Sequence, residues 1–283
     1  MNLRKSAPLE LKQVGRRASV AVGKATAGAR IEPSFLLVGG QRCGTTSLYR
    51  ALLQHPSIVS ATFHKGVNYF DVNYERGPRW YRGHFPLRRP GTTTGPLAFD
   101  ASGYYMFHPH APRRIVHDLP DVKIVAMVRD PVERAYSAYQ HELMRGFETE
   151  QFATALELED DRVLPELERM LNDESYQSST HRHQAYRRRG EYAQQLQPFI
   201  SALGPTHVFV MESERFFEDP QHEYAGLLQF LRLAEVGTTR FDRYNARARS
   251  PLDEGLRQEL RDHFASHDDA LAGLLGRQPR WRL

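Results

Sequence analysis

The segment that most constrains this chain is Gly39–Ser47, which reads GGQRCGTTS. It follows the apolar run Phe35–Val38, a candidate buried strand, and it precedes an amphipathic helix pattern from Thr46 to Leu53. Glycines allow a tight turn whose backbone N–H groups point inward, and a helix N-terminus adds partial positive charge. The segment therefore predicts an anion-binding loop between a strand and a helix. A tight turn without a ligand is the alternative.

This loop departs from the pattern of ATP- and GTP-binding loops at one position. The G-x-x-x-x-G-K-[ST] pattern would place a lysine where this chain has Thr45, and the cation stands instead at Arg42. Without that lysine the loop lacks the charge that holds a β- and a γ-phosphate. The loop suits a single phosphate that carries another group, and a nucleotide kinase on a degenerate phosphate loop is the weaker alternative.

Two more apolar runs predict further buried strands, at Lys123–Val128 and at His207–Met211. Asp130 and Pro131 supply an N-cap and a first-turn proline for a helix through about Met144. Further helix patterns cover residues 221–231 and 252–275. Strands that alternate with helices imply a parallel sheet with helices on both faces. We therefore expect a three-layer, P-loop-like α/β fold.

Length and charge limit the domain organisation. The 283 residues fit one large domain, which we place at residues 31–283 after a basic N-terminal arm of residues 1–30. The arm has a net charge of +6 and the remainder of −2, so the body shows no sign of binding nucleic acid. We expect the arm to be flexible or loosely helical. A peripheral contact with a membrane or a partner is the alternative.

The single cysteine, Cys43, excludes a disulfide framework and favours a reducing compartment. No apolar run reaches the ~18 residues of a membrane span, and the first thirty residues lack the apolar stretch of a signal peptide. The sequence therefore predicts a cytoplasmic protein.

Four segments together resemble the sulfotransferases that use 3′-phosphoadenosine-5′-phosphosulfate (PAPS), and within them the bacterial relatives of the heparan sulfate sulfotransferases. These segments are Gly39–Leu48, Val125–Tyr139, Arg189–Leu196 and Asn245–Trp281. The resemblance implies that PAPS donates a sulfuryl group to a hydroxyl or an amine and leaves as 3′-phosphoadenosine 5′-phosphate (PAP), with no metal required.

The resemblance also implies a set of nucleotide-binding residues. The loop would hold the 5′-phosphosulfate through Gln41, Arg42, Cys43, Gly44, Thr45, Thr46 and Ser47. Arg129 and Ser137 would bind the 3′-phosphate, Tyr192 would flank the nucleotide, and Arg247 and Arg249 would lie in a late loop over the 3′-phosphate.

Physical arguments bear on these assignments separately. Arg129 ends a buried strand, where ligands sit in parallel sheets, and its guanidinium matches a phosphate dianion. An ion pair with Asp130 or Glu133 is its alternative. Tyr192 is nearly as well explained as a core tyrosine, and the late arginines as a solvated loop.

The catalytic residues follow from the chemistry of in-line displacement at sulfur. A cation must stabilise the charge that grows on the leaving oxygen, and Arg42 and Lys65 are the candidates. The family often has a glutamate as general base where this chain has Gly66. We expect His64 to take that role, because a neutral imidazole accepts protons at neutral pH. Asp100 is the rival, and Asp71 or no protein base remain open.

The acceptor is poorly specified. Residues 148–174 carry a net charge of −8, which would repel a polyanion and favours a small-molecule, glycan or lipid acceptor that is neutral or cationic. A solvated helical lid explains the same charge. We read His181 and His183 as part of a polar loop and expect no metal site. The oligomeric state stays open, as does a PAP-binding protein that lost catalysis through Gly66.

Overall fold

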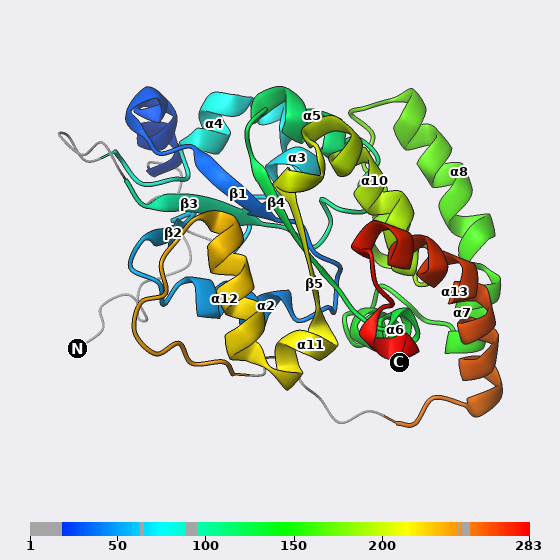
Figure 1. The fold of residues 1–283 in the computed structure, drawn as a ribbon. Helices are drawn as coiled ribbons and strands as arrows, with labels where there is room; N and C mark the ends of the chain where they lie inside the picture. The colour runs from blue at the N-terminus through cyan, green and yellow to red at the C-terminus, as the bar shows by residue number, and fades with distance from the viewer. Residues whose placement is uncertain (1–18, 63–64, 89–94, 243, 245–249) are drawn as a thin grey trace, which may run out of the picture.

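The computed structural model describes residues 19–62, 65–88, 95–242, 244 and 250–283. Its centre is a five-stranded sheet in the order β2-β3-β1-β4-β5, and every pair of neighbouring strands is parallel (Figure 1). The strands are β1 (Pro33–Leu37), β2 (Ile58–Ser60), β3 (Leu97–Ala101), β4 (Lys123–Val128) and β5 (Val208–Glu212). The predicted α/β fold with a central parallel sheet is confirmed.

Three strands were predicted and two were not. β4 has the predicted bounds, β5 begins and ends one residue later than predicted, and β1 overlaps the predicted run at residues 35–37. β2 has only three residues, and β3 contains the buried Asp100. Neither strand forms the uninterrupted apolar run on which the prediction depended.

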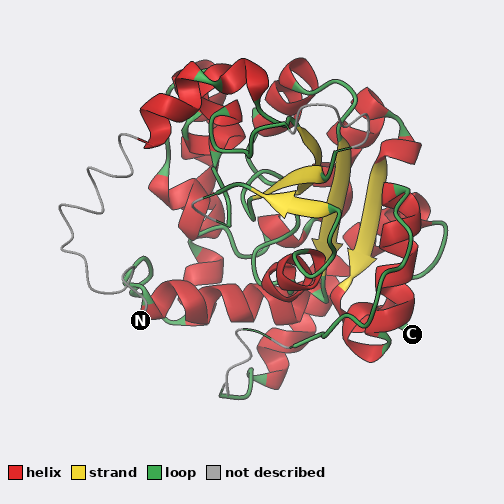
Figure 2. Cartoon of the chain, turned by 90° about the vertical axis from the view of Figure 1, so that its left-hand side faces the viewer, coloured by secondary structure: helices red, strands yellow, loops and turns green. Residues whose placement is uncertain are grey.

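Helices surround the sheet, as Figure 2 shows. They are α2 (Thr45–Leu52), α3 (Tyr69–Val72), α4 (Pro78–Arg82), α5 (Ala111–Asp118), α6 (Pro131–Met144), α7 (Phe152–Glu157), α8 (Glu159–Asn172), α9 (Ser179–His183), α10 (Tyr192–Leu203), α11 (Ser213–Glu218), α12 (Pro220–Leu231) and α13 (Glu254–Leu275). The predicted cap of α6 is confirmed, because the Asp130 carboxylate accepts hydrogen bonds from the backbone nitrogens of Val132 and Glu133.

The two faces of the sheet pack against different helices. Leu36 and Ile124 belong to a core that includes residues of α3, α4, α5, α10 and α13. Phe35 and Val125, their neighbours in sequence, belong to a second core with α2, α11 and α12. Successive residues of a strand point to opposite faces, so strands buried on both sides are continuously apolar. None of the described helices is long and apolar enough to cross a bilayer.

The strand order determines where a ligand binds. The chain passes from β1 to one side of the sheet for β2 and β3, and it returns to the other side of β1 for β4 and β5. In open parallel sheets, ligands bind beyond the carboxyl ends of the strands where the order reverses. Here that point lies between β1 and β4, the strands that lead into the two predicted anion-binding motifs.

The described part of the predicted N-terminal arm packs on the body. Residues 19–25 are helical, and Ala27 is buried. Gly23 packs so closely on Gly83 that a Cβ on Gly23 would lie 2.4 Å from the Gly83 oxygen. The Arg30 side chain donates a hydrogen bond of 2.5 Å to the Phe85 oxygen. Residues 19–30 are therefore part of the packed body, and residues 1–18 lie outside the described residues.

Candidate active site

The loop after β1 requires glycine at several positions. A Cβ on Gly39 would lie 2.5 Å from the backbone nitrogen of Met127, and a Cβ on Gly40 would lie 2.7 Å from the Cys43 sulfur. Gly44 has a φ of 82°, a left-handed conformation that glycine adopts without steric penalty. The Gly40 nitrogen also donates to the Met127 oxygen at 2.9 Å. The loop is therefore held against the end of β4 before it enters α2.

Arg42 joins this loop to the second motif. Its φ of 71° is unusual for arginine, and such conformations persist where surrounding contacts impose them. The Arg42 Nε donates to the Ser137 hydroxyl at 3.0 Å, and Arg129 donates to the Arg42 oxygen at 3.3 Å. Arg129 also lies 3.8 Å from the Glu133 carboxylate, the ion pair that the sequence offered as an alternative. Three residues predicted to bind anions, from two motifs, are therefore linked by hydrogen bonds.

Lys65 lies at the first turn of α2. Its Nζ donates to the Thr45 hydroxyl at 3.2 Å and to the Thr46 hydroxyl at 3.0 Å. Burial lowers the pKa of Lys65 to about 8. The ammonium therefore remains mostly protonated at neutral pH, at the helix N-terminus where an anion is expected.

Two predicted nucleotide-binding residues have buried side chains. Burial raises the pKa of the Cys43 thiol to about 11, and the Cys43 oxygen accepts a hydrogen bond of 2.5 Å from Ser213. The Ser47 hydroxyl is buried and accepts a hydrogen bond from the backbone nitrogen of Tyr244 at 3.1 Å. Both side chains shape the loop from below and are not exposed at its surface.

Tyr192 also supports the motifs from the interior. The residue is buried, and its hydroxyl donates to the Arg129 oxygen at 2.7 Å. The same hydroxyl lies 3.8 Å from the Cys43 sulfur. This arrangement fits the alternative interpretation of Tyr192 as a core tyrosine, since its hydroxyl holds the backbone behind both motifs.

Gln41 connects the loop to two residues that the sequence did not single out. Its amide nitrogen donates to the Glu142 carboxylate, and its amide oxygen accepts from Arg189 at 2.9 Å. Arg189 is buried and donates a second bond, of 3.1 Å, to the Gly103 oxygen. Gln41 is therefore fixed on both sides.

Asp100 occupies a structural position. One carboxylate oxygen accepts from the backbone nitrogens of Val67 at 2.9 Å and Ala101 at 2.8 Å, and the other accepts from the Tyr105 hydroxyl at 2.7 Å. The residue is fully buried, and burial raises the pKa of its carboxyl to about 6. A carboxylate with these partners ties the segment after Lys65 to β3. The geometry does not support the catalytic role that the sequence offered for it.

Gly66 is a consequence of the same packing. A Cβ on Gly66 would lie 2.1 Å from the Ala101 oxygen, so no side chain fits there while this backbone is kept.

Three predicted site residues, His64, Arg247 and Arg249, lie outside the described residues. Asp71 is buried and accepts a hydrogen bond of 2.8 Å from Ser102.

A polar cavity of about 210 Å³ lies beside the hydrogen bonds that join Gln41 to Glu142. Its lining residues come from several segments and are Val72, Tyr104, His108, Met170, Gln177, Ser178, Ser179, Arg182 and His183. The Nδ1 of His183 lies 3.1 Å from Glu142, the carboxylate that also binds Gln41, and the His183 ring stacks on Phe147. The cavity is therefore connected to the phosphate loop by hydrogen bonds.

The family follows from a comparison with known proteins. A family model described as "Sulfotransferase domain" matches residues 32–246. The chain belongs to this sulfotransferase family. The matched region contains β1 to β5 and both predicted anion-binding motifs, so the resemblance noted in the sequence is confirmed.

The sulfotransferase is similar to parts of much longer proteins. It is 40% identical over 115 residues to the mouse "Bifunctional heparan sulfate N-deacetylase/N-sulfotransferase 4" and 41% identical over 116 residues to the human "Bifunctional heparan sulfate N-deacetylase/N-sulfotransferase 3". Each match covers 39% of this chain and 13% of the relative. The chain therefore spans a small part of these relatives.

A solved structure supports the same fold over most of the chain. The "Sulfotransferase from Alicyclobacillus acidocaldarius" superposes with a TM-score of 0.73 at 27% identity. The match covers 89% of this chain and 100% of that one.

The sulfotransferase also contains groups that the sequence reading missed. His181 and His183 belong to the short helix α9 and not to a polar loop, and the pairing of His183 with Glu142 had no local sequence signal. A different group had one. His263 and His267 are four residues apart, a spacing that brings two histidines together on a helix.

Proposed function

We propose that this sulfotransferase takes its sulfuryl group from PAPS. One observation carries the proposal: Arg42 of the first motif donates to Ser137 of the second at 3.0 Å, and Arg129 donates back to the Arg42 oxygen at 3.3 Å. Two anion-binding motifs at the ends of neighbouring strands suit a nucleotide with phosphates at both ends. The Lys65 ammonium and the Thr45 hydroxyl would lie at the 5′-phosphosulfate, and Arg129 and Ser137 at the 3′-phosphate.

The residues then have separate roles in the displacement. The lone pair of the acceptor oxygen or nitrogen attacks sulfur, and the bond from sulfur to the bridging phosphate oxygen breaks. That oxygen leaves with the electron pair as part of PAP. Lys65 and Arg42 stabilise the charge that grows on it, because a fixed cation in a partly buried site is worth more than one in water. The acceptor's proton must go to a base.

His183 is the described residue whose surroundings best suit that base. Glu142 lies 3.1 Å from its Nδ1, which fixes the ring and leaves Nε2 to accept a proton. His183 also lines the cavity of about 210 Å³ next to the Gln41 network. His64, the base that the sequence predicted, remains a candidate.

The acceptor is proposed to carry a hydroxyl or an amine without a dense negative charge. Five acidic residues of the segment 148–174 are exposed, namely Glu157, Asp161, Glu168, Asp173 and Glu174. Glu148 and Glu159 are buried against arginines and add less to the field. The relatives' names describe N-sulfation of heparan sulfate, so an amino sugar is a suitable first acceptor.

The test is transfer of label from [³⁵S]PAPS to a panel with an amino sugar, a neutral alcohol and a polyanionic amino polysaccharide. Transfer to the first two with little to the third supports the proposal. Tight PAP binding without any transfer would instead support a nucleotide-binding protein.

The base is tested by the pH dependence of transfer to the alcohol. With His183 as base, the rate should rise with pH, because only a neutral imidazole accepts a proton. His183→Gln should remove this limb and slow the alcohol reaction by about 10²-fold or more, while transfer to a deprotonated amine changes little. A limb that survives in His183→Gln and disappears in His64→Gln would assign the base to His64.

A further inference from the structure

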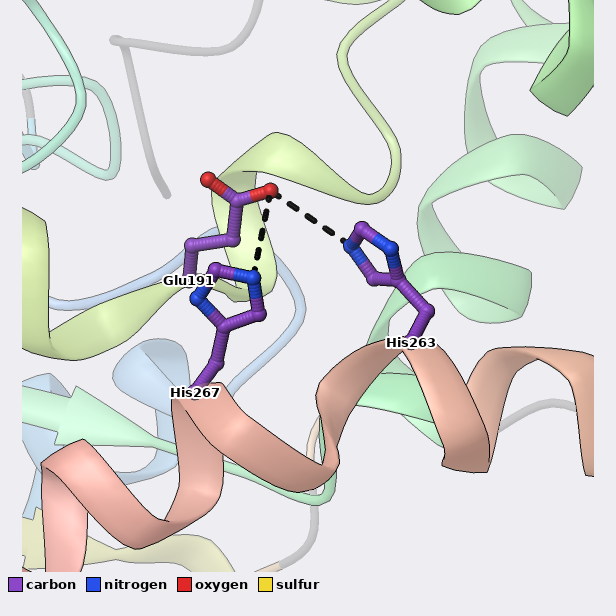
Figure 3. A group of neighbouring side chains, drawn as sticks. All are labelled: Glu191, His263 and His267. Atoms are coloured by element: carbon purple, nitrogen blue, oxygen red, sulfur yellow. Dashed lines mark ion pairs between the residues drawn. The ribbon is translucent and has the colours of Figure 1, made fainter.

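A group of three ligand-type side chains lies away from the phosphate loop, where α10 meets α13. Glu191 directly precedes α10, and His263 and His267 lie one turn apart on α13. Figure 3 shows both imidazoles rising from α13 toward the same oxygen of the Glu191 carboxylate. Residues i and i+4 share one face of a helix, so the H-x-x-x-H spacing presents two ring nitrogens together.

The distances are close to those of a coordination sphere. The Glu191 Oε1 lies 3.5 Å from the His263 Nε2 and 3.9 Å from the His267 Nε2, and the three ligand atoms all lie within 4.8 Å of one another. Ligands at about 2.0–2.1 Å from a tetrahedral zinc ion are about 3.4 Å apart. Small side-chain rotations would therefore bring all three atoms to bonding distance.

The polar groups are incompletely satisfied without an ion. The His263 Nε2 is buried and makes no hydrogen bond in the described structure, although it faces the carboxylate. Such a buried polar atom costs free energy unless it finds a partner. The three side chains retain partial exposure, with fractions of 12% for Glu191, 31% for His263 and 23% for His267, so an ion and a water molecule can enter.

We propose that Glu191, His263 and His267 bind a divalent transition-metal ion, for which Zn²⁺ is the best match. Two imidazoles and one carboxylate are common zinc ligands, and water would complete a four-coordinate site. This proposal does not depend on the donor, the acceptor or the catalytic base.

The position of the group indicates a stabilising role. Glu191 lies between Arg189, which donates to Gln41 of the phosphate loop, and Tyr192, which donates to the Arg129 oxygen. Gly190 packs so tightly on α13 that a Cβ there would lie 2.8 Å from the Phe264 ring. A metal ion at Glu191 would therefore fix α13 to the segment that supports both anion-binding motifs.

The experiment measures zinc binding to the full chain after removal of metal with a chelator. Competition with a chromophoric zinc chelator should give one site per chain, and elemental analysis after gel filtration should find one retained zinc ion. Co²⁺ in place of zinc should give the intense visible absorption of a four-coordinate site, a signature that an ion pair cannot produce.

The variants are His263→Gln, His267→Gln and Glu191→Gln, with His222→Gln on the exposed surface of α12 as the matched control. Each ligand variant should weaken zinc binding by at least about 10-fold, and the control should bind like the wild type. Melting curves in chelator test folding. The ligand variants should melt near the metal-free wild type and should lose only the increase in melting temperature that zinc produces.

Two results would overturn the proposal. The first is no retained zinc and no cobalt spectrum in the wild type, which would leave Glu191 and the two histidines as a side-chain cluster that binds no metal. The second is equal zinc binding by the wild type and the two histidine variants, which would place any bound zinc elsewhere. If Glu191→Gln is the only ligand variant that remains folded in chelator, its zinc affinity replaces that of the histidine variants. An affinity equal to that of the wild type would then overturn the proposal.

Discussion

The loop after β1 and the segment that begins at Lys65 meet at the start of α2, but different constraints hold them. In the loop, Gly39 and Gly40 pack against the backbone of β4, and Arg42, Thr45 and Thr46 are partly exposed. In the Lys65 segment, Gly66 packs on the Ala101 oxygen, and the neighbouring Asp100 of β3 is fully buried. The loop, the predicted donor side, therefore keeps partly exposed polar side chains, whereas Gly66 and Asp100, on the predicted acceptor side, serve packing.

This difference limits where a catalytic base can come from. A glutamate at position 66 would overlap the Ala101 oxygen, and the Asp100 carboxylate already accepts three hydrogen bonds. The described part of the chain offers His183 with its Glu142 partner instead. Donor binding and proton transfer are therefore expected to respond to different substitutions.

The largest effect is expected from Lys65→Ala. Removing the cation that contacts Thr45 and Thr46 should reduce the turnover number by about 10²- to 10³-fold, because the charge on the leaving oxygen then loses one of its two stabilising cations. Affinity for PAP should change far less. Arg79→Ala, an exposed arginine on α4, is the control. A loss confined to the Michaelis constant for PAPS would show that Lys65 only binds.

The next effect tests whether the acid can be restored. Gly66→Ala should lower the free energy of unfolding by about 3 kcal/mol, because its Cβ would lie 2.1 Å from the Ala101 oxygen. Gly28→Ala should change it by less than about 0.5 kcal/mol, because, its chain neighbours aside, no atom of the described residues lies within 4 Å of the added Cβ. Urea denaturation measures both. Equal stability of the two variants would remove the packing explanation for Gly66.

A smaller effect separates Asp100 from catalysis. Burial raises the pKa of its carboxyl from 3.8 to about 6, so the folded protein binds a proton that the unfolded chain releases near pH 4. The stability associated with the protonated form is present below about pH 4 and is lost as pH rises through 6. Relative to Asp100→Asn, the wild type should lose about 2 kcal/mol between pH 4.5 and 6.5.

Denaturation series at the two pH values measure this change, and parallel curves would show that Asp100 keeps an ordinary pKa. The pH profile of the transfer rate should meanwhile keep its rising limb in Asp100→Asn. Loss of that limb would return Asp100 to the list of bases.

The sequence predicted the donor side because its determinants are local. The order of strand, glycine turn and helix from Phe35 to Leu53 needs no distant contact to be read, and the Asp130 cap of α6 is equally local. β3 could not be read this way. Its Asp100 is buried only because Val67, Ala101 and Tyr105 donate to it, and two of these lie outside the strand.

The acceptor side and the histidine group depend on contacts between distant residues. Nothing near His183 in the sequence shows that Glu142 lies beside it, since α6 and α9 are brought together by the fold. The four-residue spacing of His263 and His267 is present in the sequence. The third residue of the group, Glu191, lies at the start of another helix, α10. Cys43 was predicted to contact the nucleotide, and Tyr192 was predicted either to flank it or to be a core tyrosine, because burial cannot be read from a motif.

The most direct test of the central claim, that two motifs form one donor site, is calorimetric titration with PAP and with adenosine 5′-monophosphate, which lacks the 3′-phosphate. The wild type should prefer PAP, and Arg129→Ala should cost about 1.5 to 3 kcal/mol in PAP binding, a loss of roughly 10- to 150-fold. The affinity of Arg129→Ala for adenosine 5′-monophosphate should stay close to that of the wild type. Equal affinity of the wild type for the two nucleotides would contradict the account.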